Sequence, residues 1–274
     1  MVMATMEPII QSTEITTPTS STIRQASDQK RARSLTRAVW RGVTPVVSVL
    51  LGGLLIYLSI PRTIAAWTSL EAQTAIDKLQ NGKLPSDQEL VHGASALQSA
   101  LAWAPSPRRL TDLALLELEQ ASRLPVASPA RNELLVKAEL HLIDGLVANP
   151  ANGFAWLRLA IVRELRGAPA RQVALALAQS LDMAPNMRKL WLPRASLFFV
   201  YWRDLTFEEL LAMRAQLRTI WTADPDSRRA LMQAAGQAGQ LAVLSWALQD
   251  SPPSQADVEK IKSSVPSSLP QEAK

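Results

Sequence analysis

One stretch of the chain, Val43–Ile60, restricts the possible folds more than any other. Its eighteen residues carry no charge, and Arg41 and Arg62 stand just outside its two ends. As a helix it would be about 27 Å long, close to the apolar thickness of a bilayer. Residues 43–61 are therefore predicted to form a single N-terminal membrane-spanning helix.

Two alternatives to a membrane span are weaker. A buried helix of a soluble protein usually has one polar face, whereas this stretch is apolar all round. A signal peptide has a shorter apolar run near the start of the chain, followed by a small-residue cleavage site. Here forty-two residues precede the run, and the sequence LSIP at residues 58–61 is a poor cleavage site. An uncleaved span is the preferred interpretation.

The charges on the two sides of the stretch predict its orientation. Residues 1–42 carry six basic and three acidic side chains, whereas only Arg62 and Lys78 are basic in the twenty residues after Pro61. Since basic segments stay in the cytoplasm, this arm is predicted to be cytoplasmic and the rest of the chain to lie across the membrane. The arm is rich in Ser, Thr, Pro and Gln and is expected to be disordered. The residues expected at the interfaces of the lipid bilayer are Trp40, Arg41, Arg62 and Trp67.

Composition excludes several function classes. The net charge of +5 includes +3 from the arm, so residues beyond it form no strongly basic surface and no nucleic-acid partner is expected. The absence of cysteine suits an oxidising compartment and excludes disulfides, thiolate metal sites and a cysteine nucleophile. The two histidines, His92 and His141, stand far apart. The local cluster of Glu139, His141 and Asp144 is more simply explained by a hydrogen-bonded histidine than by a metal ligand or a base. No catalytic residue, metal site or cofactor is predicted, and the protein is expected not to be an enzyme.

Beyond the apolar stretch, residues 62–250 are expected to be helical throughout. Thr63–Leu79 has a helical pattern and ends at a stop signal, Asn81-Gly82. A second helix is predicted between Ser86 and Ala104, and Pro, Gly or Asn marks each later break. Residues 251–274 are rich in Pro and Ser and are predicted to form a disordered tail.

The helical region contains a repeated pattern anchored on four prolines, spaced 45, 35 and 40 residues apart. A leucine stands eight residues before each proline, a large apolar residue stands four before it, and the residue five before is small in three of the four cases. Two of the prolines are followed six residues later by tryptophan. The prolines are Pro105, Pro150, Pro185 and Pro225, and the tryptophans are Trp156 and Trp191.

This pattern predicts helical hairpins, in which proline ends one pair of helices and begins the next. One hairpin cannot bury its own apolar face, so several must stack. The 35-residue unit, best seen in Gly153–Pro185, resembles the tetratricopeptide repeat. The resemblance implies an all-α solenoid of about four to five hairpins, with a concave surface formed by the first helix of each pair. An irregular helical bundle is the alternative.

A second resemblance covers about a hundred residues from Asn152 onward. The segments FAWLRLAIVRELRGAP and RASLFFVYWRDLTFEELLAMRAQLRTIW are similar to bacterial exopolysaccharide-biosynthesis proteins of the VpsP kind. The matching residues are Trp156, Leu159, Ala160, Pro185, Arg194, Trp202 and Leu205. The likeness implies a single-pass protein of the bacterial inner membrane with a periplasmic repeat domain, and an accessory part in making or exporting a surface polysaccharide.

Three functions remain open at this stage. The first is a membrane-anchored periplasmic scaffold that binds protein partners of an envelope assembly complex, with the polysaccharide as a further candidate partner. The second is a repeat chaperone for another envelope process, such as cytochrome maturation. The third and least favoured is an enzyme acting on glycans. Candidate groove residues for a partner are Leu157, Arg158, Ile161 and Arg194, while Trp202 could stack on a sugar ring.

Overall fold

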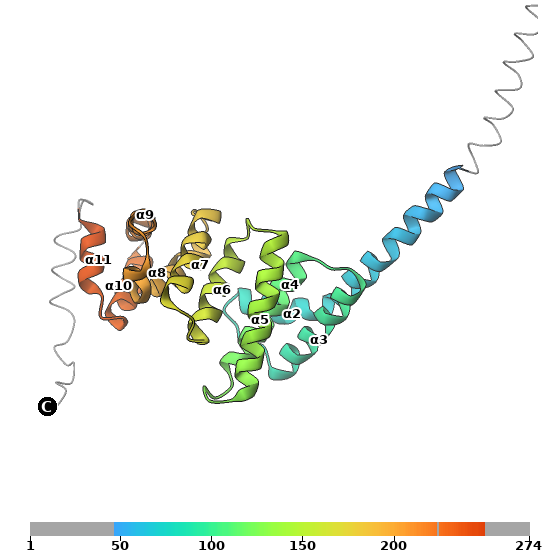
Figure 1. Cartoon of the computed structure of the whole chain (residues 1–274), viewed down its shortest axis with the longest axis horizontal. Coiled ribbons are helices and arrows are strands. Elements are labelled where there is room, and N and C mark those ends of the chain that lie inside the picture. The colour runs from blue at the N-terminus through green and yellow to red at the C-terminus, as the bar shows by residue number, and fades with distance from the viewer. Residues whose placement is uncertain (1–46, 224, 250–274) are drawn as a thin grey trace, which may run out of the picture. The chain divides into compact units, whose positions relative to one another are not determined.

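The computed structural model describes residues 47–223 and 225–249 of the 274-residue chain, and all the regular structure in these ranges is helical. The chain divides into two compact units, Met1–Ile60 and Pro61–Lys274. An apolar helix, Val47–Thr68, is followed by the helices labelled in Figure 1. These are α2 (Leu70–Gln80), α3 (Asp87–Trp103), α4 (Pro107–Ser122), α5 (Pro129–Ala148), α6 (Gly153–Leu165), α7 (Ala170–Met183), α8 (Arg188–Tyr201), a 3-10 turn η1 (Trp202–Asp204), α9 (Phe207–Ala223), α10 (Pro225–Gln237) and α11 (Leu241–Leu248).

The apolar helix is long enough to cross a membrane. Over its most apolar eighteen residues the mean hydropathy is 1.7, and only 6% of that window is buried. A core helix of this protein would be mostly covered, so the low burial favours the membrane interpretation. The predicted start at Val43 lies outside the described residues, as do Trp40 and Arg41.

The predicted end of the span at residue 61 is not where the helix ends. It continues through Pro61 to Thr68, so Arg62 and Trp67 belong to the same helix as the apolar stretch. Proline removes one backbone donor and one helical hydrogen bond, but it did not end the helix here. The helix ends before Ser69, and this break divides the single helix expected over Thr63–Leu79.

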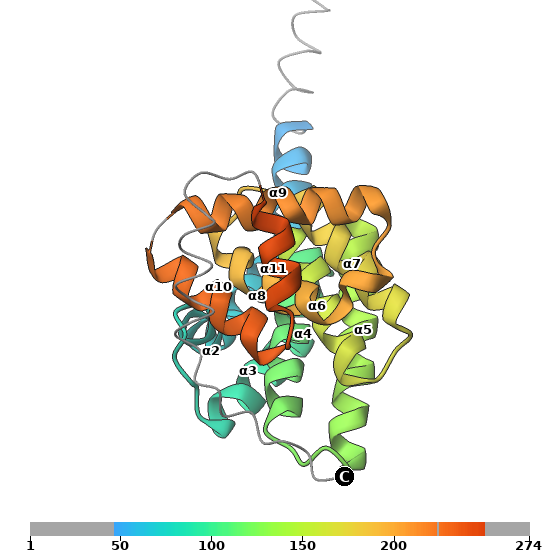
Figure 2. The same ribbon diagram turned by 90° about the vertical axis from the view of Figure 1, so that its left-hand side faces the viewer.

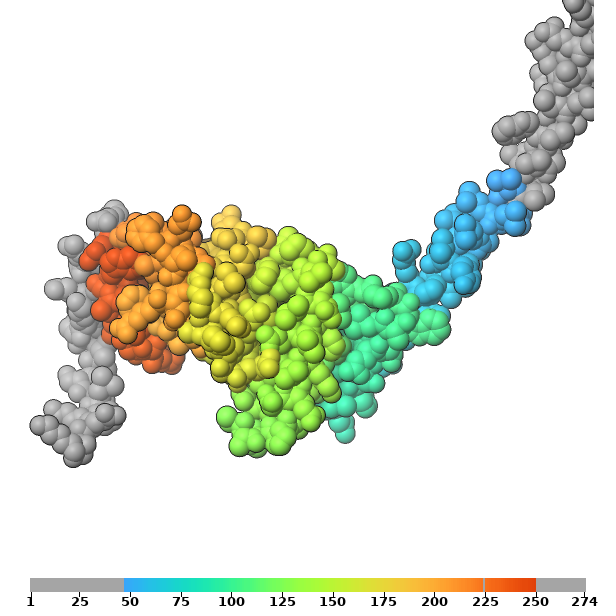
Figure 3. Space-filling view, viewed as in Figure 1, coloured from blue at the N-terminus to red at the C-terminus, as the bar shows by residue number. Residues whose placement is uncertain are grey.

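The four anchor prolines stand at equivalent breaks. They separate α3 from α4, α5 from α6, α7 from α8 and α9 from α10. Helices adjacent in sequence pack on each other, most extensively α4 on α5 and α6 on α7. The first helices of successive pairs also touch, α2 with α4, α4 with α6, α6 with α8 and α8 with α10. In Figure 3 the colours of the helical domain follow one another in sequence order, as this neighbour-to-neighbour packing requires.

The leucine eight residues before each proline is part of the core. Leu97, Leu142, Leu177 and Leu217 are all at most 2% exposed. The small residue five before the proline allows close packing, and this is plainest at Gly145. A Cβ there would lie 2.8 Å from Cγ2 of Thr111 and 3.2 Å from the carbonyl oxygen of Pro107, both in α4. The small side chain therefore sets how closely α4 and α5 approach.

The tryptophan six residues after a proline has a definite structural role. The indole Nε1 of Trp156 donates a hydrogen bond to the carbonyl oxygen of Pro150 at 2.8 Å. Trp191 does the same to Pro185 at 3.3 Å. Each indole thus ties the start of a first helix to the turn before it, which explains the fixed spacing.

Buried residues form two clusters rather than one. The smaller lies among α2, α3 and α4 and is made of alanine, leucine and one isoleucine, Ile76. The larger runs from α4 to α11 and contains the buried aromatic side chains Trp191, Phe198, Phe199 and Trp221. At its far end α9, α10 and α11 contact one another (Figure 2). Helix α4 contributes to both clusters.

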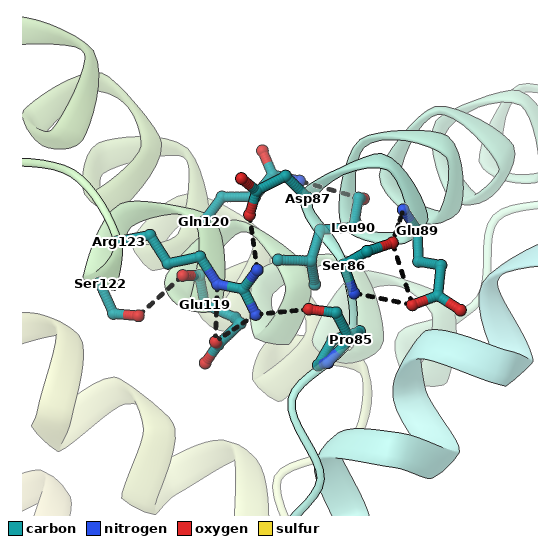
Figure 4. Close-up of polar contacts among 9 residues, drawn as sticks. All are labelled: Pro85, Ser86, Asp87, Glu89, Leu90, Glu119, Gln120, Ser122 and Arg123. Atoms are coloured by element: carbon teal, nitrogen blue, oxygen red, sulfur yellow. Dashed lines mark hydrogen bonds and ion pairs between the residues drawn. The ribbon is translucent and has the colours of Figure 1, made fainter.

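Polar contacts join the beginning of α3 to the end of α4 (Figure 4). Arg123, directly after α4, donates from Nη1 to Oδ1 of Asp87 at 2.5 Å and from Nη2 to the carbonyl oxygen of Pro85 at 2.8 Å. Ser86 and Glu89 form a capping box at the start of α3. The end of α4 is therefore fixed against the beginning of α3.

Candidate binding groove

A groove of about 760 Å³ crosses the first helices of four successive pairs. Its lining comes from the end of α2, from α4, α6 and α8, and from the residues just before α6. The lining residues are Leu79, Gln80, Gly82, Arg108, Thr111, Asp112, Leu115, Asn149, Asn152, Phe154, Leu157, Arg158, Ile161, Lys189, Leu190 and Pro193.

Two of the helices present the same pattern to the groove. Helix α4 supplies four residues at relative positions 0, 3, 4 and 7, which form one face of a helix. Helix α6 supplies four residues at the same relative positions. The α4 set is Arg108, Thr111, Asp112 and Leu115, and the α6 set is Phe154, Leu157, Arg158 and Ile161. One set is mainly polar and the other mainly apolar, so the groove has chemically different walls.

The α4 and α6 walls are linked through Arg158. Its Nη1 donates a hydrogen bond to the carbonyl oxygen of Thr111 at 3.0 Å. Burial lowers the pKa of the Arg158 guanidinium, and the nearby Asp112 carboxylate opposes that change. Burial also raises the pKa of Asp112 from its ordinary value, against the effect of Arg158 and Arg108. The Nε of Arg108 lies 3.7 Å from Oδ2 of Asp112. The charges of Arg158, on the α6 wall, and of Asp112, on the α4 wall, are thus both poorly hydrated.

Three of the predicted partner-binding residues lie together in the groove. Leu157, Arg158 and Ile161 are all on the α6 wall. Leu157 is only 4% exposed, whereas Arg158 and Ile161 are half-buried. The prediction that the first helix of a pair carries the surface therefore agrees with the geometry at α6.

Arg194 was expected in the groove, and this expectation is wrong. Its side chain is completely buried, with Nε donating to Oγ of Ser180 at 2.9 Å and Nη1 donating to the carbonyl oxygen of Ala184 at 3.0 Å. A further hydrogen bond goes to the carbonyl oxygen of Ser180. Both carbonyls lie at the C-terminal end of α7, where Arg194 adds to the backbone hydrogen bonds that they accept from Ala184 and Met187. Burial lowers the pKa of Arg194 to about 10, so the side chain stays charged at neutral pH.

Trp202 does not line the groove either. It begins η1, is half-buried and packs against the larger cluster. The guanidinium carbon of Arg203 lies 5.1 Å from the centre of its ring. Arg203 therefore covers one face of the indole, and a sugar stacking on that face would have to displace it.

Sequence reasoning missed the groove residues contributed by α4 and α8. Arg108 lines the groove, whereas the neighbouring Arg109 donates a hydrogen bond to the carbonyl oxygen of Ala104 at 3.0 Å. The shared 0, 3, 4, 7 spacing on α4 and α6 was a usable signal. Lys189 gave no comparable signal.

The histidine cluster has a structural explanation. Nδ1 of His141 lies 2.8 Å from Oε2 of Glu117, a carboxylate only 2% exposed, and this contact raises the pKa of His141. Glu139 pairs instead with Arg163 and Arg166. Within residues 47–223 and 225–249, no group of three or more His, Asp or Glu side chains could hold a metal ion.

Comparisons with protein-family models, with curated proteins and with solved structures gave no match to this chain. The resemblances to the tetratricopeptide repeat and to the exopolysaccharide-biosynthesis proteins therefore remain predictions. What can be said of function rests on the apolar helix and on the groove.

Proposed function

We propose that this protein is a membrane-anchored scaffold whose helical-repeat domain holds a segment of a partner protein in the groove. The observation that carries the proposal is the lining of the groove, which comes from the first helices α2, α4, α6 and α8. Stacked helical pairs offer an extended binding surface of this kind. The Val47–Thr68 helix would keep that surface at the membrane.

The chemistry of the lining favours binding over catalysis. It contains one carboxylate, Asp112, and its other charged groups are Arg108, Arg158 and Lys189. A glycosidase needs two facing carboxyl groups about 5–10 Å apart. With a single lining acid, the glycan-enzyme alternative is the weakest of the three.

The cellular setting stays a proposal that rests on the sequence. The basic arm favours a cytoplasmic N-terminus, and the resemblance to the exopolysaccharide-biosynthesis proteins implies a bacterial inner membrane with the repeat domain in the periplasm. Within that setting we place the scaffold in surface-polysaccharide biosynthesis or export, with chaperoning in another envelope process as the alternative. An alkaline phosphatase reporter fused after Lys274 would be active only if the C-terminus is periplasmic.

Site-directed photocrosslinking in intact membranes tests the binding proposal. A benzoylphenylalanine placed at Ile161, on the groove wall, is expected to crosslink to a defined segment of one partner, mapped by mass spectrometry. The control position is Val147, which is 80% exposed on α5 and outside the groove lining. Identical adducts at both positions, or none at Ile161, would reject the groove as the binding site. The identity of the partner then separates polysaccharide assembly from the alternative process.

A further inference from the structure

The charges lining the groove do not cancel. Arg108, Arg158 and Lys189 bring three positive charges, whereas Asp112 brings one negative charge. The side chain of Arg108 is 79% exposed and Lys189 is also exposed, so both can reach a bound molecule. The groove therefore offers a net positive charge to whatever occupies it.

Arg158 is the cation that would gain most from an added anion. It lies half-buried between α4 and α6, and its only hydrogen bond among the described residues goes to the carbonyl oxygen of Thr111. Charge interactions are stronger where water is excluded. A guanidinium has five N–H donors, so Arg158 can donate to a carboxylate while keeping its hydrogen bond to Thr111.

Apart from Arg158, the residues that α6 contributes to the groove are apolar. Phe154, Leu157 and Ile161 of α6 form one wall, and Leu115 and Leu190 adjoin it. Such a surface buries aliphatic or aromatic side chains, which peptides carry and polysaccharides lack. The carboxamides that line the groove can pair with the backbone of an extended peptide: Gln80, Asn149 and Asn152.

We infer that the groove binds an extended acidic peptide segment, whose carboxylates pair with Arg158 and Lys189 while its apolar side chains cover Phe154, Leu157 and Ile161. This inference rests on the proposed function, because it names the chemistry of the segment held there. An anionic polysaccharide would match the charges but would leave the apolar wall uncovered.

Fluorescence anisotropy with the full chain in detergent micelles tests this inference. The probes are three fluorescein-labelled peptides of about ten residues, long enough to span about 33 Å when extended. They share the same leucine and serine positions and differ only in carrying glutamate, glutamine or lysine. We expect the glutamate peptide to bind about tenfold more tightly than the glutamine peptide, and the preference to shrink as salt rises. The lysine peptide should bind weakest.

Substitutions assign the effect to the groove. Lys189→Gln alters an exposed side chain and should weaken the glutamate peptide about fivefold, while Arg158→Gln should weaken it more and Arg158→Lys should restore part of the loss. Arg229→Gln is the matched control, since Arg229 is exposed on α10 and pairs with Asp226. Circular dichroism of each variant checks that helix content is unchanged.

Three results would overturn the inference. The first is equal binding of the glutamate and glutamine peptides. The second is a loss of affinity in Arg229→Gln as large as in Lys189→Gln. The third is binding of a polyuronate oligosaccharide to a protein that does not bind the glutamate peptide. If Ile161 still crosslinks to one partner segment in membranes, the scaffold proposal stands and only the acidic specificity fails. If that crosslink is also absent, both fail.

Discussion

Helices α6 and α8 are the first helices of successive pairs, and each carries an arginine at nearly the same position. The two arginines lie in different environments. Arg158 stands eight residues after Pro150, and Arg194 stands nine residues after Pro185. The first lines the groove and the second is completely buried. The other residue at each of these two positions shows the same difference. Pro193, eight residues after Pro185, lines the groove, whereas Leu159, nine residues after Pro150, is only 1% exposed.

The comparison teaches that one position along a first helix changes the environment of a side chain from groove to core. A residue turns about 100° around the helix axis relative to its neighbour. At the later position an arginine must satisfy its donors internally, and Arg194 does so on the C-terminal carbonyls of α7. The equivalent leucine in α6 needs no such partners.

Removing the buried arginine should have the largest effect. Arg194→Ala is expected to lower the free energy of unfolding by about 2–4 kcal/mol, because it leaves a cavity and removes three hydrogen bonds to the end of α7. Arg158→Ala, in the groove, should cost less than about 1 kcal/mol. Denaturant unfolding of the full chain in detergent measures both. Equal losses at the two sites would break the comparison.

Close packing beneath Arg194 gives the next largest effect. A Cβ added at Gly153 would lie 2.5 Å from Cβ of Ala184 and 3.1 Å from the carbonyl oxygen of Ser180, the same turn that Arg194 caps. Gly153→Ala should therefore destabilise the protein by about 1–3 kcal/mol. Gly236→Ala is the control, since a Cβ at that helical position meets nothing within 4 Å and should be neutral or slightly stabilising. A neutral Gly153→Ala would show that α6 and α7 can separate without cost.

The tryptophan hydrogen bonds show a feature that α6 and α8 share. Trp156→Phe and Trp191→Phe each remove one indole donor to a proline carbonyl. Each is expected to cost about 0.5–1.5 kcal/mol in the same unfolding assay. Trp103→Phe serves as the reference, because the indole of Trp103 is exposed and makes no hydrogen bond to the described residues. A loss at Trp103 as large as at the other two would refute the role assigned to the spacing.

The smallest effect concerns pH and lies in the preceding pair, α4 and α5. The contact with Glu117 raises the folded-state pKa of His141 above its unfolded value. Its contribution to stability is therefore complete below the unfolded pKa, about 6.5, and is lost as pH rises through the folded value. Unfolding midpoints measured on both sides of that window should fall with rising pH, and His141→Gln should flatten the change. If the unfolding midpoint changes equally with pH in the unsubstituted protein and in His141→Gln, the pH dependence does not come from His141.

Much of the helical organisation could be predicted because it is local. Proline blocks helix continuation wherever it stands, so Pro105, Pro150 and Pro185 marked breaks between helices. The same local rule predicted that the membrane-spanning helix ends at Pro61, but the helix continues to Thr68. On α6 the candidate site was also predictable, since Leu157, Arg158 and Ile161 share one helix face.

The rest of the candidate site depended on contacts between distant segments. Nothing near Lys189 or Asp112 in the sequence indicates that they line the same groove, because they lie on different helices. Arg194 was misplaced for a related reason. The carbonyls that hold it belong to α7, and a charged residue is expected at a surface unless such partners are known.

The sequence by itself determined that the chain has one uncharged apolar run and a series of proline-punctuated helical pairs, because charge, length and proline act on the residues beside them. Only the tertiary structure decided which side of each first helix is covered. That choice depends on how neighbouring pairs stack, and on α6 apolar residues occupy both sides, with Leu157 in the groove and Leu159 in the core.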